Sequence, residues 1–147
     1  LSELPLESLA DLEGIVVRVE RFGRAISAKA FHGLDVKGKA VLIHTNWSRH
    51  WRTDQYFEGH PFLTEDAAKF LAVSSAAFVG IDTYNIDDIT DSTRPVHTIL
   101  LSCRIPICEH MCGMEKLPDS GFRFHAAPVK VKAFGTFPVR AYAVLDT

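Results

Sequence analysis

The stretch PVHTILLSCRIPICEH, residues 95–110, gives the clearest indication of the fold in this sequence. Its apolar first part, residues 97–103, predicts a short helix, and residues 105–109 predict a strand that follows directly. Yet His97 and Glu109 are groups that do not enter an apolar core cheaply. Because a helix that turns back into a strand brings its two ends together, we expect this imidazole and this carboxylate to converge on one point.

The segments on either side of this stretch predict a chain in which strands dominate. Residues 40–44 are apolar throughout, as in a strand that is buried on both faces. Thr64 and the two acidic residues after it are typical of a helix start. We expect strands at residues 15–19, 40–44, 76–81, 122–131 and 139–145, and helical segments at 4–12, 25–31 and 65–72. The predicted fold class is α/β, with a mixed sheet or barrel-like β core and flanking helices.

Composition limits the classes of function. The 147 residues suit a single domain, and 47% hydrophobic residues supply a core without disulfides or a structural metal. The net charge is −2 with no block of Lys and Arg, which argues against a nucleic-acid partner. No apolar run approaches the roughly 20 residues of a membrane span. Three cysteines and no signal peptide favour the cytoplasm.

After the apolar residues 40–44, the segment TNWSRHWRTDQYFEGHP, residues 45–61, is mostly polar and rich in aromatic and imidazole groups, as in a loop. Trp47, His50 and Trp51 are our candidates for a pocket that takes a flat substrate, because rings stack on rings. The alternative is that both tryptophans anchor the loop, and the two roles are compatible. Asp82 ends a predicted buried strand, where it either faces a pocket or caps the following turn.

Two sets of metal-ligand types stand out. His97 and Glu109 suit half of a divalent-metal site, or else form a buried hydrogen-bonded pair without a metal; zinc enzymes normally use at least three protein ligands. Cys108, His110 and Cys112 have the spacing of a zinc knuckle, but no second pair follows them. Thiols that behave as small apolar groups are the better interpretation of these cysteines.

Several segments, taken in order, resemble the cyclase family of metal-dependent hydrolases, which includes bacterial kynurenine formamidase. They are Gly80-Ile-Asp-Thr83, Pro95-Val-His97, Ile105-Pro-Ile-Cys-Glu109, Leu117-Pro-Asp-Ser-Gly-Phe-Arg-Phe124 and Pro138-Val-Arg-Ala141, with Asn46-Trp-Ser-Arg-His-Trp51 and Tyr56-Phe-Glu-Gly-His-Pro61 upstream. The resemblance implies a swivelling β/β/α fold. It also implies His97 and Glu109 as ligands of zinc or manganese, and hydrolysis of a small amide or lactam, such as N-formylkynurenine, by metal-activated water.

The chain departs from the family in one respect. The H-x-G-T-H-x-D-x-P-x-H motif, which in the family carries the other ligands and the catalytic histidine, is absent, so the catalytic residues here are unknown. We therefore expect residues 1–147 to be a single cyclase-like domain shortened at its N-terminus, with weak or no metal binding on its own. Exposed edges predict a homo-oligomer. The alternative is a catalytically inactive scaffold or small-molecule binding protein with the same fold.

Overall fold

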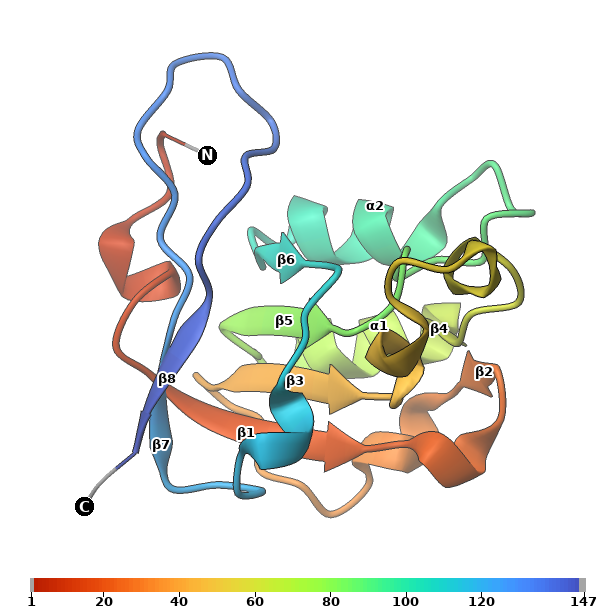
Figure 1. Cartoon of the computed structure of the whole chain (residues 1–147). Helices are drawn as coiled ribbons and strands as arrows, with labels where there is room; N and C mark the ends of the chain where they lie inside the picture. The colour runs from red at the N-terminus through yellow and green to blue at the C-terminus, as the bar shows by residue number, and fades with distance from the viewer. Residues whose placement is uncertain (1, 146–147) are drawn as a thin grey trace.

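A six-stranded mixed sheet with two α-helices on one face forms the body of the protein (Figure 1). The computed structural model describes residues 2–145. The strand order is β6-β5-β3-β1-β7-β8. The first four of these run parallel to one another, and the last two continue the sheet antiparallel. The elements are β1 (Leu12–Arg18), β3 (Ala40–His44), β5 (Phe78–Ile81), β6 (Ile107–Cys108), β7 (Phe122–His125), β8 (Tyr142–Leu145), α1 (Glu65–Val73) and α2 (Pro95–Ser102).

Short elements make up the connections. The strands β2 (Ala25–Ile26) and β4 (Phe62–Leu63) form a separate two-stranded parallel sheet. Within residues 2–145, six 3-10 turns precede or connect the longer elements, at Leu6–Ser8, Glu20–Phe22, Ala28–Phe31, Trp47–His50, Asp54–Phe57 and Met114–Lys116. The helix expected over residues 25–31 is wrong. Its first residues pair with β4 instead, and only the remainder forms a 3-10 turn, because a distant strand satisfies the backbone that a helix would have satisfied locally.

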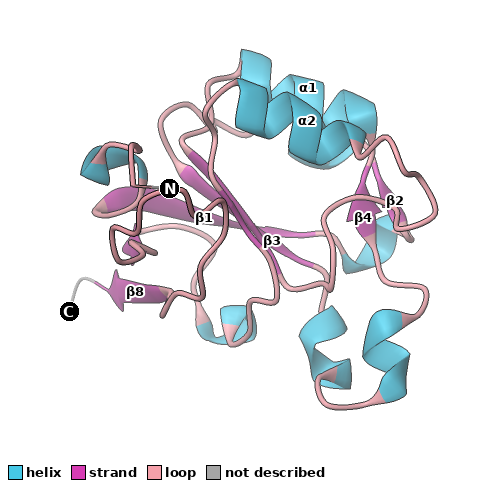
Figure 2. Ribbon diagram, turned by 90° about the horizontal axis from the view of Figure 1, so that it is seen from above, coloured by secondary structure: helices cyan, strands magenta, loops and turns pink. Residues whose placement is uncertain are grey.

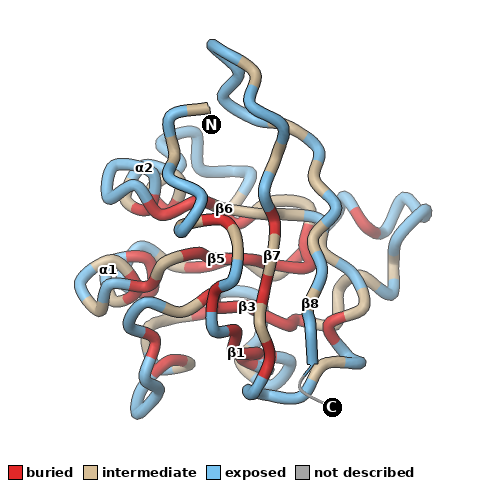
Figure 3. Tube along the Cα trace, turned by 90° about the vertical axis from the view of Figure 1, so that its left-hand side faces the viewer, coloured by how far each residue is buried: buried red, intermediate tan, exposed pale blue. Residues whose placement is uncertain are grey.

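Alternating side chains of the central strands build two apolar layers. Every residue of β3 and β5 is buried. Val41 and Ile43 of β3 face the layer under α1 and α2, while Ala40 and Leu42 face the opposite layer. Figure 2 shows both helices on one side of the sheet and β8 on the other. Buried segments follow β1, β3 and β5 through the centre of Figure 3, as a sheet with apolar residues on both faces requires.

The sheet curls rather than staying flat. In Figures 1 and 3, β7 and β8 run steeply across the direction of β1 and β3. The result is half of a barrel whose concave face is not covered by the helices, which confirms the predicted α/β class with a barrel-like β core. Among residues 2–145 no helix has both the length and the apolar character needed to cross a membrane.

Close approach of β7 to β1 makes Gly14 a position without room for a side chain. Gly14 pairs with Phe122, and a Cβ built on it would lie 2.0 Å from the Phe122 ring. A Cβ on Gly80 would instead come close to the Met111 sulfur and to a Leu42 methyl group, both of which belong to flexible side chains. We expect Gly14→Ala to lower the free energy of unfolding by about 2 kcal/mol, because the buried ring must shift, and Gly80→Ala to cost less than about 1 kcal/mol. Urea denaturation of both variants tests this, and equal losses would contradict it.

Candidate metal half-site and adjoining cavities

Polar side chains gather where the four parallel strands end. Arg18 closes β1 and His44 closes β3, while Asp82 directly follows β5 and Glu109 directly follows β6. In an open parallel sheet, the carboxyl ends of the strands are where ligands bind. Apart from Glu13 near the start of β1, these strands are otherwise apolar, so the polar groups at their ends mark this edge as the candidate site.

The structure brings His97 and Glu109 together across the start of α2. His97 Nε2 lies 3.5 Å from Glu109 Oε1, and both side chains are mostly shielded from solvent. The same carboxylate oxygen accepts a hydrogen bond of 2.7 Å from the backbone N–H of Ile86, which fixes its position. The two ends of the quoted stretch thus converge, and their role as metal ligands stays a prediction.

Asp87 holds the imidazole from behind. Its carboxylate oxygens accept hydrogen bonds from the backbone N–H groups of Val96 at 2.7 Å and His97 at 3.1 Å, in the first turn of α2. Oδ2 also lies 2.6 Å from His97 Nδ1. With Asp87 ionised, Nδ1 carries the proton that forms this bond, which orients the ring as carboxylates do behind metal-bound histidines.

With the proton on Nδ1, the lone pair of His97 Nε2 points toward a lone pair of Glu109 Oε1. These lone pairs repel each other, and a cation between them would remove the repulsion. In the neutral ring, Nε2 is an acceptor, and it faces a carboxylate oxygen at a distance beyond a normal hydrogen bond. An imidazole nitrogen and a carboxylate oxygen are both common ligands of zinc and manganese. The pair therefore fits a divalent cation, but only as part of a larger set, since no group of three or more His, Cys, Asp or Glu suited to a metal occurs within residues 2–145.

Next to this pair, a row of polar groups crosses the sheet from the exposed Arg18 to the buried His44, Thr45 and Asp82. Arg18 and His44 are register partners on β1 and β3, with Arg18 Nη1 3.2 Å from His44 Nδ1. Asp82 Oδ1 accepts hydrogen bonds from the Thr45 backbone N–H at 2.9 Å and hydroxyl at 2.6 Å. His44 Nε2 and Asp82 Oδ2 are buried and have no hydrogen-bond partner among the described residues. Asp82 therefore both holds the next loop and keeps one oxygen unused.

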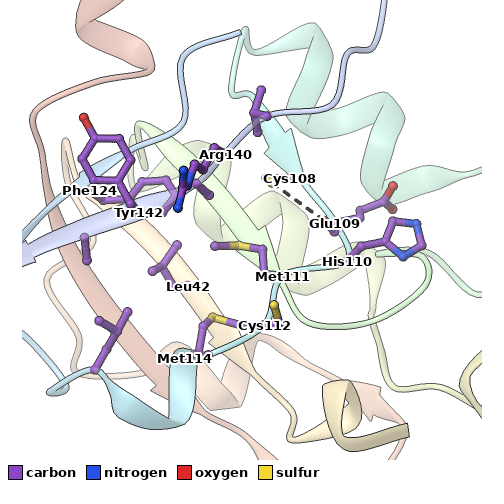
Figure 4. Close-up of a pocket in the computed structure, with 15 residues that line it drawn as sticks. Leu42, Cys108, Glu109, His110, Met111, Cys112, Met114, Phe124, Arg140 and Tyr142 are labelled. Atoms are coloured by element: carbon purple, nitrogen blue, oxygen red, sulfur yellow. Dashed lines mark hydrogen bonds between the residues drawn. The ribbon is translucent and has the colours of Figure 1, made fainter. Parts of the chain in front are cut away.

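Two cavities open on the concave face beside these groups. The smaller, of about 360 Å³, lies between residues 108–117 and residues 139–143, and Figure 4 shows its lining. The larger, of about 730 Å³, extends toward residues 135–139. Glu109 and His110 line both cavities, so they mark the junction between them. In Figure 4 these two side chains lie next to each other at one end of the smaller cavity.

The three residues predicted to line a substrate pocket, Trp47, His50 and Trp51, do not share one location. Trp51 lines the larger cavity and packs edge-on against Tyr56, with ring centroids 4.9 Å apart. Trp47 contacts the His50 ring at 4.6 Å and donates its indole N–H to the Tyr56 carbonyl oxygen. Neither Trp47 nor His50 lines either cavity. The loop thus uses Trp47 to hold itself in place and presents Trp51 to the larger cavity, and a role of these residues in substrate binding stays a prediction.

The three cysteines differ in exposure: Cys103 and Cys112 are exposed, whereas Cys108 is partly buried. Burial, with a contribution from the Glu109 charge, raises the pKa of the Cys108 thiol from 9.0 to about 11. Its thiolate fraction at about pH 8 is therefore about 100-fold lower than that of an unshifted thiol. We expect iodoacetamide to alkylate the exposed Cys103 well before Cys108. Peptide mass spectrometry over time measures this order, and faster labelling of Cys108 in the folded protein would contradict it.

Three residues of the site were not singled out by sequence reasoning. Asp87 was only one of several acids in a polar loop, Tyr56 was one aromatic in a long loop, and Arg18 lay within the strand predicted at residues 15–19. A signal for Asp87 exists: α2 begins with Pro95 after Arg94, which makes no side-chain cap, so its first N–H groups need an acceptor from elsewhere. Tyr56 and Arg18 act through partners that are far away in the sequence, for which no local signal exists.

A curled mixed sheet with helices on one face, and an imidazole–carboxylate pair at its carboxyl edge, defines an α/β protein of the cyclase type. The model of the Cyclase family, described as "Putative cyclase", matches residues 1–88, and the chain belongs to this family. The family assignment made from the sequence is thereby confirmed.

The chain is also similar to individual proteins. Uncharacterized protein MJ0783 of Methanocaldococcus jannaschii is 32% identical over 108 residues, which cover 71% of this chain and 53% of that protein. The chain thus spans about half the length of this curated relative. A potential metal-dependent hydrolase with cyclase activity is similar in structure, with a TM-score of 0.76 and 25% identity over 96% of this chain and 68% of that one. An isatin hydrolase bound to the product analogue thioisatinate shares the fold, with a TM-score of 0.88 and 20% identity over 99% and 64%.

Proposed function

We propose that this chain is part of a divalent-metal-dependent hydrolase that acts on a small amide or lactam, with His97 and Glu109 as two of the metal ligands. The observation that carries the proposal is the approach of His97 Nε2 to Glu109 Oε1, which lie 3.5 Å apart. Asp87 orients the His97 ring through a contact with its other nitrogen, Nδ1. The similarity to a potential metal-dependent hydrolase with cyclase activity supports it. An N-formylkynurenine-like substrate and zinc or manganese are the finer parts of the proposal.

The chain's own residues supply orientation and a shaped cavity. When bound, the metal would polarise a carbonyl and acidify water, which is the chemistry that amide hydrolysis needs. Asp87 keeps the His97 ring turned toward Glu109, and the Ile86 N–H keeps Glu109 turned toward His97. We propose that the remaining ligands and the general acid–base group come from a segment of the H-x-G-T-H-x-D type outside residues 1–147.

A second copy of the protein is the partner we propose for the outer strand β8. Its exposed apolar side chains are Tyr142, Val144 and Leu145, which are 47–54% exposed. A sheet edge with apolar side chains favours pairing with another chain. Light scattering on the purified protein tests this, and a monomer at working concentration would contradict it.

The test of the enzymatic proposal uses the complete gene product. Elemental analysis of the purified protein is combined with an activity screen on N-formylkynurenine, other N-formyl arylamines and aryl lactams, with added zinc or manganese. We expect metal-dependent hydrolysis of at least one of these substrates, and its loss on chelation. Protein that holds neither metal nor activity under both metals would refute the proposal.

A non-catalytic scaffold or binding protein is the second candidate. The observation that favours it is that residues 2–145 contain no group of three metal-ligating side chains. Such a protein would bind a small molecule in the cavities beside His110 without consuming it. Binding of an N-formyl arylamine that is returned unchanged, by a metal-free complete gene product, is the result expected from this candidate.

A further inference from the structure

His110 occupies an unusual position at the junction of the two cavities. It has φ 58°, in the left-handed region that costs a non-glycine residue energy. Its backbone N–H donates to the Thr83 carbonyl oxygen at 3.0 Å, so the conformation is held by the loop that follows β5. The side chain is exposed and lines both cavities. A strained backbone conformation thus directs this imidazole toward the open face of the site.

Three aromatic rings pack around the imidazole. The centroids of Tyr84, Tyr56 and Trp51 lie 5.7, 5.8 and 5.9 Å from that of His110. Of these groups, Tyr56 also reaches His110 by a hydrogen bond, with its hydroxyl 3.0 Å from Nδ1. Tyr56 is 1% exposed, whereas His110 faces the cavities. The ring therefore has one nitrogen bound to the interior, which leaves the other on the outer side.

The direction of the Tyr56–His110 bond follows from the needs of the phenol. A buried O–H requires an acceptor, and among the described residues His110 Nδ1 is the hydrogen-bond partner of this hydroxyl. If Nδ1 carried a proton and donated to the oxygen, the phenolic hydrogen would have no acceptor in that part of the chain. Burial and the nearby Asp82 and Glu109 charges also raise the pKa of Tyr56, so the phenol keeps its proton. The hydroxyl thus donates to Nδ1.

We propose that Tyr56 is a positioning residue that holds His110 in the Nε2–H tautomer, which presents a hydrogen-bond donor to the ligand in the cavities. The partner of this donor would be the carbonyl oxygen of a small amide or lactam, or the carboxylate of the product. This role rests on the proposed function for the identity of the ligand. The tautomer itself does not, because it depends only on the Tyr56–His110 contact.

Nitrogen NMR reads the tautomer directly. With ¹⁵N-labelled histidine, long-range proton–nitrogen correlations distinguish a protonated ring nitrogen from an unprotonated one. We expect His110 to show protonated Nε2 and unprotonated Nδ1, and its signals are assigned by their loss in His110→Asn, since asparagine tolerates the left-handed backbone. In Tyr56→Phe the preference should give way to a mixture of tautomers. A protonated Nδ1 in the unaltered protein would overturn the proposal, whether or not the variants fold.

Tyr84→Phe is the matched control. Tyr84 touches the His110 ring as closely as Tyr56 does, but the hydroxyl hydrogen bond to His110 comes from Tyr56. Removing the Tyr84 hydroxyl should leave the His110 tautomer unchanged. If both phenylalanine variants altered the tautomer equally, the effect would come from packing, and the assignment of Tyr56 as the positioning residue would be wrong.

Binding of thioisatinate tests the donor role separately from catalysis. Titrated into the complete gene product, this carboxylate should shift the His110 Nε2 signals, and His110→Asn should weaken its binding about tenfold, as loss of one hydrogen bond predicts. Unchanged Nε2 signals, or equal affinity in His110→Asn, would overturn the donor role. A locked tautomer and a shifted Nε2 signal in a protein that hydrolyses nothing would support this inference and count against the proposed function alone.

Discussion

Replacing Asp87 with alanine is expected to lower the free energy of unfolding by about 3 kcal/mol. Asp87 is 1% exposed, and its carboxylate accepts three hydrogen bonds, two of them from backbone N–H groups in the first turn of α2. Alanine would leave the N–H groups of Val96 and His97 and the His97 ring without this acceptor. The loss combines a missing helix cap with unsatisfied donors, and it removes a negative charge from the positive end of the helix.

Two further variants make the Asp87 experiment specific. Asp87→Asn keeps Oδ1, which accepts the Val96 N–H, and replaces the oxygen that faces His97, so we expect about half of the alanine effect. Asp91→Ala removes a carboxylate that binds Thr93 within an exposed turn, and it should cost less than about 0.5 kcal/mol. Urea denaturation measures all three. A loss below about 1 kcal/mol for Asp87→Ala would mean that α2 does not depend on this cap.

The parts of the fold that local patterns predict are those in which burial decides the structure. Residues 40–44 form β3 as expected, because five consecutive apolar or shielded positions suit only a strand with both faces covered. The helix that begins after Thr64 is also observed, with acidic residues in its first turn. The strand expected at residues 105–109 shortens to residues 107–108, where it pairs with β5. β6 lies at the edge of the sheet, where a short strand limits pairing with other chains.

The parts that local patterns miss depend on pairing between distant residues. Ala25 and Ile26 join β4 rather than a helix, and no local feature signals that partner. In the site, Tyr56 meets His110 across 54 positions and Arg18 meets Asp119 across 101. The convergence of His97 and Glu109 was predictable since a helix and a returning strand connect them directly. Sequence reasoning therefore predicted a contact between groups that a single helix–turn–strand segment connects. It missed contacts between groups that come together only when the whole sheet has formed.

Replacing Glu109 with glutamine is expected to abolish metal-dependent stabilisation of the complete gene product while leaving its fold intact. Glutamine has the same shape and keeps an oxygen for the Ile86 N–H, so the free energy of unfolding without metal should change by less than about 1 kcal/mol. It lacks the charge that would hold a cation against His97. Metal at about 100 times its dissociation constant adds about 2.7 kcal/mol to the unaltered protein, and the variant should lose most of this gain.

Thermal unfolding with and without zinc or manganese measures the Glu109→Gln effect, and hydrolysis of the substrate found for the unaltered protein should fall by about 100-fold or more. Glu115→Gln is the control, because it removes the same charge from an exposed turn. If the metal stabilised Glu109→Gln and Glu115→Gln equally, the cation would bind elsewhere. The 3.5 Å approach of His97 to Glu109 would then be an ion pair between a protonated ring and a carboxylate, which needs no metal to account for it.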